Sequence, residues 1–228
     1  MKSCIPISVS LVLALLAGWL PAAESDYKIT ELKEAPPGLS PEITAVLNET
    51  GYRVEGKGGA ICDLWLAKEV PLKPKFTPSL QVKYPFLAGQ LIGAIRFPEK
   101  VEEDDFRGQS IPPGTYTLRY GQQPNDGNHL GTSDVRDFVL ACPPKMDADP
   151  KRIEKVKDLF KLSAKAAATT HPAIFLLAPP PEKPAGAAAV HYDAEKKQVI
   201  VTVDANAKDK DQTVQVPLNI VVVGKSAG

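Results

Sequence analysis

Short runs of alternating apolar and polar residues, separated by turn residues, constrain the fold of this chain more than any other feature. In 115–120, Tyr116, Leu118 and Tyr120 share one side of an extended strand, because side chains alternate between the two faces of a sheet. Similar short runs predict strands at 27–32, 52–55, 60–68, 87–97, 115–120, 137–142, 173–178, 188–192, 198–204 and 213–223. The sequence therefore predicts a mainly β fold, either an antiparallel β-sandwich or a partly closed barrel.

Two segments follow a helical period instead. Ser40 and Pro41 suit the N-cap and the first position of a helix, and they predict a short helix near 41–49. Over about 150–168, apolar residues recur at spacings of three and four, and Pro172 follows. This pattern predicts the one substantial helix of the chain.

A proline-rich segment, 179–184, separates the last strands from the rest of the chain. It could be a linker between domains, since proline-rich segments act as semi-rigid spacers. The strands beyond it, however, could hardly bury a core alone. We therefore expect a rigid loop within a single strand-rich domain that covers 24–228.

The first 23 residues have the features of an export signal. Lys2 supplies a positive charge, a short apolar stretch follows, and small residues up to Ala23 precede a polar run. The alternative is a membrane anchor, but the apolar stretch is shorter than the roughly 20 residues that span a bilayer and contains Pro6 and Gly18. We expect a signal peptide at 1–23 and a secreted or periplasmic protein with no membrane span after cleavage.

The charge balance argues against one class of partner. The chain contains 27 basic and 27 acidic residues, and removal of the leader, with Lys2, changes this balance by a single charge. A chain so close to neutrality has no general electrostatic attraction for nucleic acid or for anionic lipid. We therefore expect no nucleic-acid partner.

Two cysteines, Cys62 and Cys142, lie within predicted strands, and both alternate with apolar neighbours. Both thiols are therefore expected to face an apolar layer. In an exported protein such a pair is a disulfide candidate. The alternative is two separate buried thiols, because buried cysteine packs as a small hydrophobic residue.

The most polar segment of the chain is the connection 121–137, which is long for a link between two strands. Long connections often carry function, and this one could hold a divalent metal or the hydroxyl groups of a sugar. The alternative is a structural loop, because Asn, Asp and Gly are also the residues that turns require. The candidate ligand-binding residues are Gln122, Asp126, Asn128, His129, Asp134 and Asp137.

Established catalytic motifs do not occur in the sequence: there is no Gly-x-Ser-x-Gly elbow, no His-Glu-x-x-His and no phosphate-binding loop. This favours a non-enzymatic exported β-sandwich that binds a ligand or partner in the cell envelope, such as an envelope protein or a glycan. One alternative is a hydrolase or lyase that uses the acidic and histidine groups of 121–137. Another is a structural component of the envelope. No cofactor is predicted, and a divalent metal at 121–137 is left open.

Overall fold

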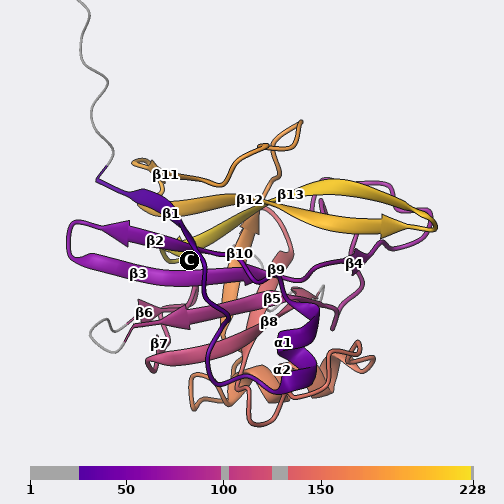
Figure 1. The fold of residues 1–228 in the computed structure, drawn as a ribbon, viewed down its shortest axis with the longest axis horizontal. Helices are drawn as coiled ribbons and strands as arrows, with labels where there is room; N and C mark the ends of the chain where they lie inside the picture. Colours follow the sequence, from indigo (N-terminus) through magenta and orange to yellow (C-terminus); the bar gives the residue numbers. More distant parts are fainter. Residues whose placement is uncertain (1–25, 99–102, 125–132, 227–228) are drawn as a thin grey trace, which may run out of the picture.

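The computed structural model describes residues 26–98, 103–124 and 133–226, and it is mainly β, with one sheet nearly closed into a barrel (Figure 1). Neighbours along the main path of the sheet pair antiparallel. In spatial order the path is β1 (Lys28–Leu32), β2 (Gly51–Gly56), β3 (Gly59–Leu66), β5 (Leu91–Phe97), β8 (Gly114–Gln122), β9 (Asp137–Cys142), β10 (Ile174–Ala178), β13 (Gln212–Val223), β12 (Gln198–Asp209) and β11 (Ala189–Asp193).

Three short strands lie off this path. β4 (Val70–Pro71) pairs parallel with β12, where the β12–β13 ribbon extends beyond the barrel (Figure 1). β6 (Glu103–Asp104) and β7 (Ser110–Ile111) form a separate small sheet.

The two ends of the sheet, β1 and β11, come together where the barrel nearly closes. The rings of Tyr27 and Tyr192 stack there, with their centroids 5.5 Å apart. Aromatic pairs in this distance range attract each other beyond their shared burial. Of the two architectures expected from the sequence, the structure has the partly closed barrel, which confirms the predicted fold class.

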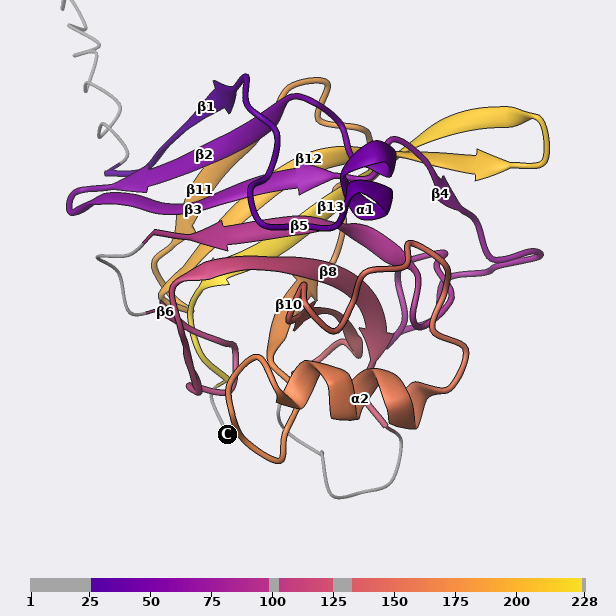
Figure 2. The ribbon, with the colours of Figure 1, turned by 60° about the horizontal axis from the view of Figure 1, so that its bottom comes forward.

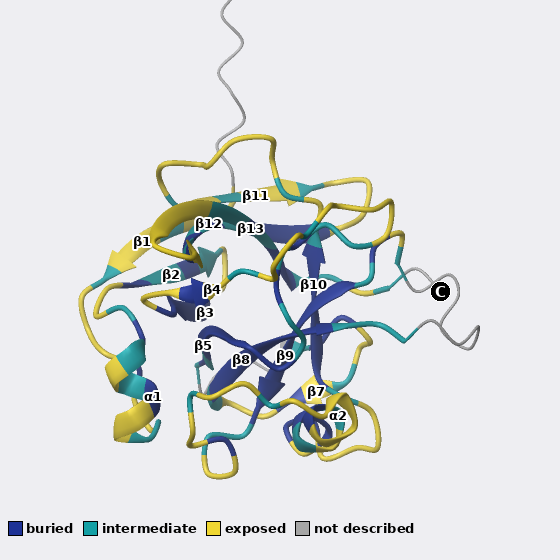
Figure 3. Ribbon diagram, turned by 90° about the vertical axis from the view of Figure 1, so that its right-hand side faces the viewer, coloured by how far each residue is buried: buried dark blue, intermediate teal, exposed yellow. Residues whose placement is uncertain are grey.

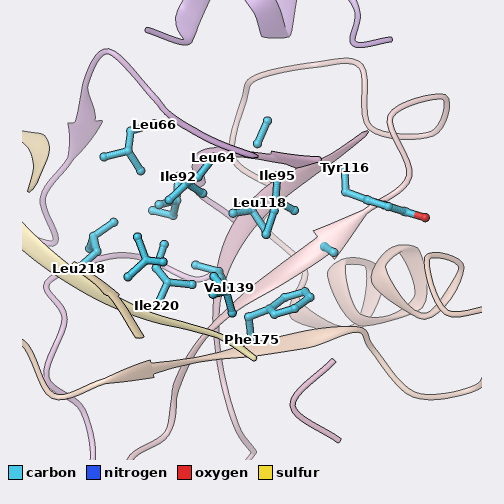
Figure 4. Packing of buried hydrophobic residues seen from close by; sticks show 14 of the residues in the cluster. Leu64, Leu66, Ile92, Ile95, Tyr116, Leu118, Val139, Phe175, Leu218 and Ile220 are labelled. Atoms are coloured by element: carbon cyan, nitrogen blue, oxygen red, sulfur yellow. The ribbon is translucent and has the colours of Figure 1, made fainter. Parts of the chain in front are cut away.

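The interior of the barrel forms the larger hydrophobic cluster, here called the barrel core. Strands from all sides of the barrel contribute to it, and their side chains point toward one another in Figure 4. Members labelled there are Leu64, Leu66, Ile92, Ile95, Tyr116, Leu118, Val139, Phe175, Leu218 and Ile220. Side-chain alternation, the pattern seen in the sequence, places most of these residues on the inner face of the barrel. Strand β5 departs from it: Ile92 and Ile95 are three positions apart yet both lie in the barrel core, and the register of β5 shifts between Leu91 and Gly93.

A second hydrophobic layer, here called the outer cluster, lies outside the barrel. Phe138, Leu140 and Cys142 of β9 point into it, while Val139 and Ala141 point into the barrel core. The helix α2 (Val156–Ala164) packs over this outer face below β8 and β10 (Figure 2). Strand β9 is therefore buried on both faces, as the dark blue of β5, β8 and β9 in Figure 3 shows.

The helix predicted over about 150–168 is shorter than expected, since α2 covers only Val156–Ala164. Its predicted first turns are irregular instead of helical because tertiary hydrogen bonds take their backbone groups. The N–H of Ile153 donates to the Gly89 carbonyl at 3.2 Å, and the carbonyl of Lys151 accepts from Arg119 at 2.8 Å. At the other end, Ala168 adopts the left-handed conformation (φ 53°), which is incompatible with a continuing helix.

The short helix α1 (Pro41–Val46) forms as predicted, although it ends before residue 49. Ser40 is its N-cap, and the Ser40 hydroxyl accepts the N–H of Ile43 at 3.1 Å. Such a bond satisfies a donor that the first helical turn leaves without a partner. Ile43 and Leu47 are buried in the barrel core, so α1 is fastened by packing as well as by its cap.

A buried ion pair holds the segment 143–153 against the outer face of β8. Arg119 is fully buried, and its Nε and Nη2 each donate to the Asp147 carboxylate at 2.7 Å. Its other N–H groups donate to the carbonyls of Gly89, Lys151 and Asp149 at 2.6 to 2.8 Å. Since guanidinium offers five donors, every one has an acceptor, as a buried cation requires.

The structure does not join Cys62 to Cys142. Cys62 lies in the barrel core, whereas Cys142 lies in the outer cluster, on the other face of the sheet. The disulfide candidate is therefore corrected to the alternative of two separate buried thiols. Each cysteine faces an apolar layer, as expected, but the two layers are different ones.

The predicted signal peptide, 1–23, lies outside the described residues. Among the residues that the structure describes, neither helix combines the length and the apolar character that crossing a membrane requires. The proline-rich residues 179–184 form a loop between β10 and β11, and most of them are exposed.

Candidate functional site

The structure describes three of the six residues that the sequence singled out. Asp126, Asn128 and His129 fall within 125–132, outside the described residues. Gln122 ends β8, Asp137 begins β9, and the two face each other across that pair of strands. Asp134 lies exposed in the bend before β9. The structure thus brings Gln122 and Asp137 together.

Tyr120 links these two side chains. The Gln122 amide donates to the Tyr120 hydroxyl at 2.8 Å, and that hydroxyl donates to Oδ1 of Asp137. The other carboxylate oxygen, Oδ2, accepts the N–H of Lys83 at 2.6 Å. Asp137 is fully buried, and both oxygens of its carboxylate accept hydrogen bonds from the protein itself, as buried polar groups generally do.

This small network also holds the end of the proline-rich segment 71–85, at Lys83 and Tyr84, against the barrel strands. Tyr84, next to Lys83, is buried and donates its hydroxyl to the Ala178 carbonyl at 2.7 Å. The same hydroxyl accepts the N–H of Asn219 at 3.1 Å. Asp137 and Tyr84 therefore fasten this segment to β9, β10 and β13.

Burial controls the protonation of the two central groups. Desolvation raises the pKa of the Asp137 carboxyl, while the hydrogen bonds from Tyr120 and Lys83 act in the opposite direction. Burial, reinforced by the nearby carboxylate of Asp137, raises the pKa of the Tyr120 phenol. The tyrosine therefore remains a hydrogen-bond donor to Asp137 at neutral pH.

The metal hypothesis has limited support in the part of the chain that is described. Within 26–98, 103–124 and 133–226, no three or more His, Cys, Asp or Glu side chains gather so as to hold a metal ion. Asp126 and His129, two of the predicted ligands, lie outside these ranges.

A pocket of about 310 Å³, here called the α2 pocket, opens beside the start of the predicted loop. Its floor consists of Phe138, Leu140 and Ile174, which are buried members of the outer cluster from β9 and β10. Phe160 of α2, half-buried, forms a side wall. This volume is at the lower end of the range of small-molecule sites, and an apolar floor is typical of them.

The rim of the α2 pocket is more polar and more exposed than its floor. Gln122 and Gln123 border it from the end of β8, while Thr170 and His171 come from the turn between α2 and β10. Arg107, exposed in the turn between β6 and β7, completes the rim. An apolar floor with a few polar groups around the opening can bury the body of a ligand and orient its head.

Two buried residues keep the pocket walls in place. Asp105 accepts the N–H of Arg107 at 2.9 Å and that of Ile174 at 3.0 Å, so it ties the turn that carries Arg107 to the pocket floor. Gly121 is needed for the floor itself, because a Cβ there would lie 2.3 Å from the Cδ1 of Leu140. Any larger residue at 121 would therefore displace Leu140.

The sequence pointed to Gln122 but missed the pocket. The apolar floor belongs to the outer cluster, and nothing in the polar loop indicates it. The available signal was the continuous apolar run 138–142 in β9, since a strand without polar alternation is typically buried on both faces. A second apolar layer under α2 follows from that run, and a pocket needs such a layer.

Comparisons of the chain with protein-family models, with curated proteins and with solved structures give no significant match. The functional proposal therefore depends on the geometry of the site.

Proposed function

We propose that this protein is a non-enzymatic binding module, exported to the periplasm or secreted, and that its ligand enters the α2 pocket. The apolar floor of Phe138, Leu140 and Ile174, sunk between α2 and the barrel, is the observation that carries the proposal. Burying an apolar ligand on this floor is favourable because it removes apolar surface from water. Such a floor suits an apolar small molecule better than a glycan, whose hydroxyl groups need hydrogen-bond partners.

The chemistry of the candidate loop supports binding over catalysis. A general acid or base must reach its substrate within hydrogen-bond distance. Asp137 is fully buried, and both of its carboxylate oxygens accept bonds from Tyr120 and Lys83. The hydrolase or lyase alternative would need to use the other acidic and histidine groups of 121–137. The export part of the proposal rests on the sequence of 1–23.

The binding proposal can be tested with a neutral, apolar fluorescent dye, N-phenylnaphthylamine, whose emission rises on entering an apolar site. Ile174→Phe adds bulk to the pocket floor, and we expect it to weaken dye binding about fivefold or more. Ile200→Phe is the matched control, because Ile200 is a similarly buried member of the outer cluster that does not line the pocket.

The two variants separate a binding site from general surface hydrophobicity. The proposal requires dye binding by the wild type, with Ile200→Phe close to it once both variants are shown to be folded by circular dichroism. Equal loss in both variants, or no dye binding by the wild type, would contradict it. The alternative of a structural envelope component predicts self-association and no dye binding.

A further inference from the structure

The ionisable side chains that line the α2 pocket are basic ones. Arg107 and His171 stand on its rim, and no aspartate or glutamate lines it among the described residues. Within 26–98, 103–124 and 133–226, the Arg107 guanidinium forms no hydrogen bond or ion pair, although its main chain is held by Asp105. The Arg107 side chain therefore presents a permanent positive charge beside an apolar cavity.

The exposed surface of α2 extends this positive border. Lys157 lies three positions before Phe160, so it is on the same side of the helix as the pocket wall. Asp158 lies two positions before Phe160, about 200° around the helix, and so points away from the pocket. The whole chain has 27 basic and 27 acidic residues, whereas the side chains named around this opening are mainly basic.

We infer that the ligand of the α2 pocket is an amphiphilic anion, an apolar body that carries one carboxylate. This inference rests on the proposed binding function and names the class of ligand. The body packs against Phe138, Leu140 and Phe160, while the carboxylate stays at the rim beside Arg107. Guanidinium matches a carboxylate in shape, because its planar fork donates two parallel hydrogen bonds.

The alternatives leave the rim unexplained. A neutral apolar ligand would fill the floor and gain nothing from Arg107. A cationic amphiphile would place like charges together at the opening, which opposes binding. The carboxylate is the choice that uses both the floor and the rim.

The test compares three molecules that share one apolar body: octanoate, octanol and octylamine. Each competes with N-phenylnaphthylamine for the purified protein at neutral pH. We expect octanoate to bind most tightly and octylamine least tightly. Raising the salt concentration should weaken octanoate and leave octanol almost unchanged, because salt screens exposed charges.

Arg107→Gln should reduce octanoate affinity about fivefold and leave octanol affinity within about twofold. Lys196→Gln is the control: it removes the same charge from an exposed turn between β11 and β12, outside the pocket lining. It should change neither affinity.

The outcomes separate the two proposals. If octanol binds as tightly as octanoate, or if Arg107→Gln weakens both equally, the anion inference is wrong while the binding function stands. If none of the three molecules displaces the dye and the dye itself does not bind, the binding function fails and the inference falls with it.

Discussion

The buried pair of Arg119 and Asp147 should be the polar contact whose loss costs this fold most. Asp147→Ala removes two of the five acceptors of a fully buried guanidinium, both at 2.7 Å, and leaves the buried positive charge without its carboxylate counter-ion. Breaking a buried ion pair in this way costs about 3–5 kcal/mol. Because the free energy of unfolding of a typical domain is only about 5–15 kcal/mol, the variant should lose a large fraction of its stability. Urea denaturation followed by circular dichroism measures the difference.

Two comparisons make this prediction sharp. Glu69→Ala breaks the exposed pair between Glu69 and Lys208, which lie 3.4 Å apart and are each 44% exposed, and it should cost at most about 1 kcal/mol. Arg119→Met combined with Asp147→Leu removes both charges, and it should recover at least half of the loss. If Asp147→Ala costs no more than Glu69→Ala, the reasoning about the buried network is refuted.

Three further predictions concern burial and export. The raised pKa of Asp137 means that the folded state binds this proton more tightly than the unfolded chain does, so protonation stabilises the fold. In urea denaturation between about pH 4 and 7, the free energy of unfolding of the wild type should therefore rise relative to that of Asp137→Asn as the pH falls. A difference between the two proteins that does not change with pH would contradict this. Cys62 and Cys142 should both be alkylated when the protein is denatured without a reducing agent, and both should be protected from alkylation in the native protein. Mass spectrometry measures this, and a peptide in which the two cysteines are bridged would refute the assignment. Export should give a mature N-terminus within a few residues of Glu24, and a product that keeps Met1 would refute it.

The strand pattern could be predicted from the sequence because alternation is a local property. The run 137–142 matches β9 as it forms, and Ser40 with Pro41 gives the start of α1. The length of α2 could not be predicted in the same way. Its expected first turns are kept out of the helix by hydrogen bonds to Gly89 and Arg119, which are distant in the sequence. Tertiary hydrogen bonds thus overrode a local helical period.

The site was harder to predict for a related reason. Alternation shows that Cys62 and Cys142 each face an apolar layer, but it does not show whether the layers are the same one. The polar residues of 121–137 drew attention to the loop, whereas the pocket floor consists of Phe138, Leu140 and Ile174 beside it. Leu140 and Ile174 lie opposite each other because β9 pairs with β10, and α2 then packs over them. No short sequence pattern encodes either of these long-range contacts.

The most direct test of the binding site is a methyl-resolved NMR titration of the protein with octanoate. The account predicts that methyl signals of Leu140 and Ile174, on the pocket floor, shift with ligand concentration. Signals of Ile92 and Leu218, which lie in the barrel core, should stay in place. Shifts confined to the barrel core, or no shifts at Leu140 and Ile174 at saturating octanoate, would contradict the claim that the α2 pocket binds the ligand.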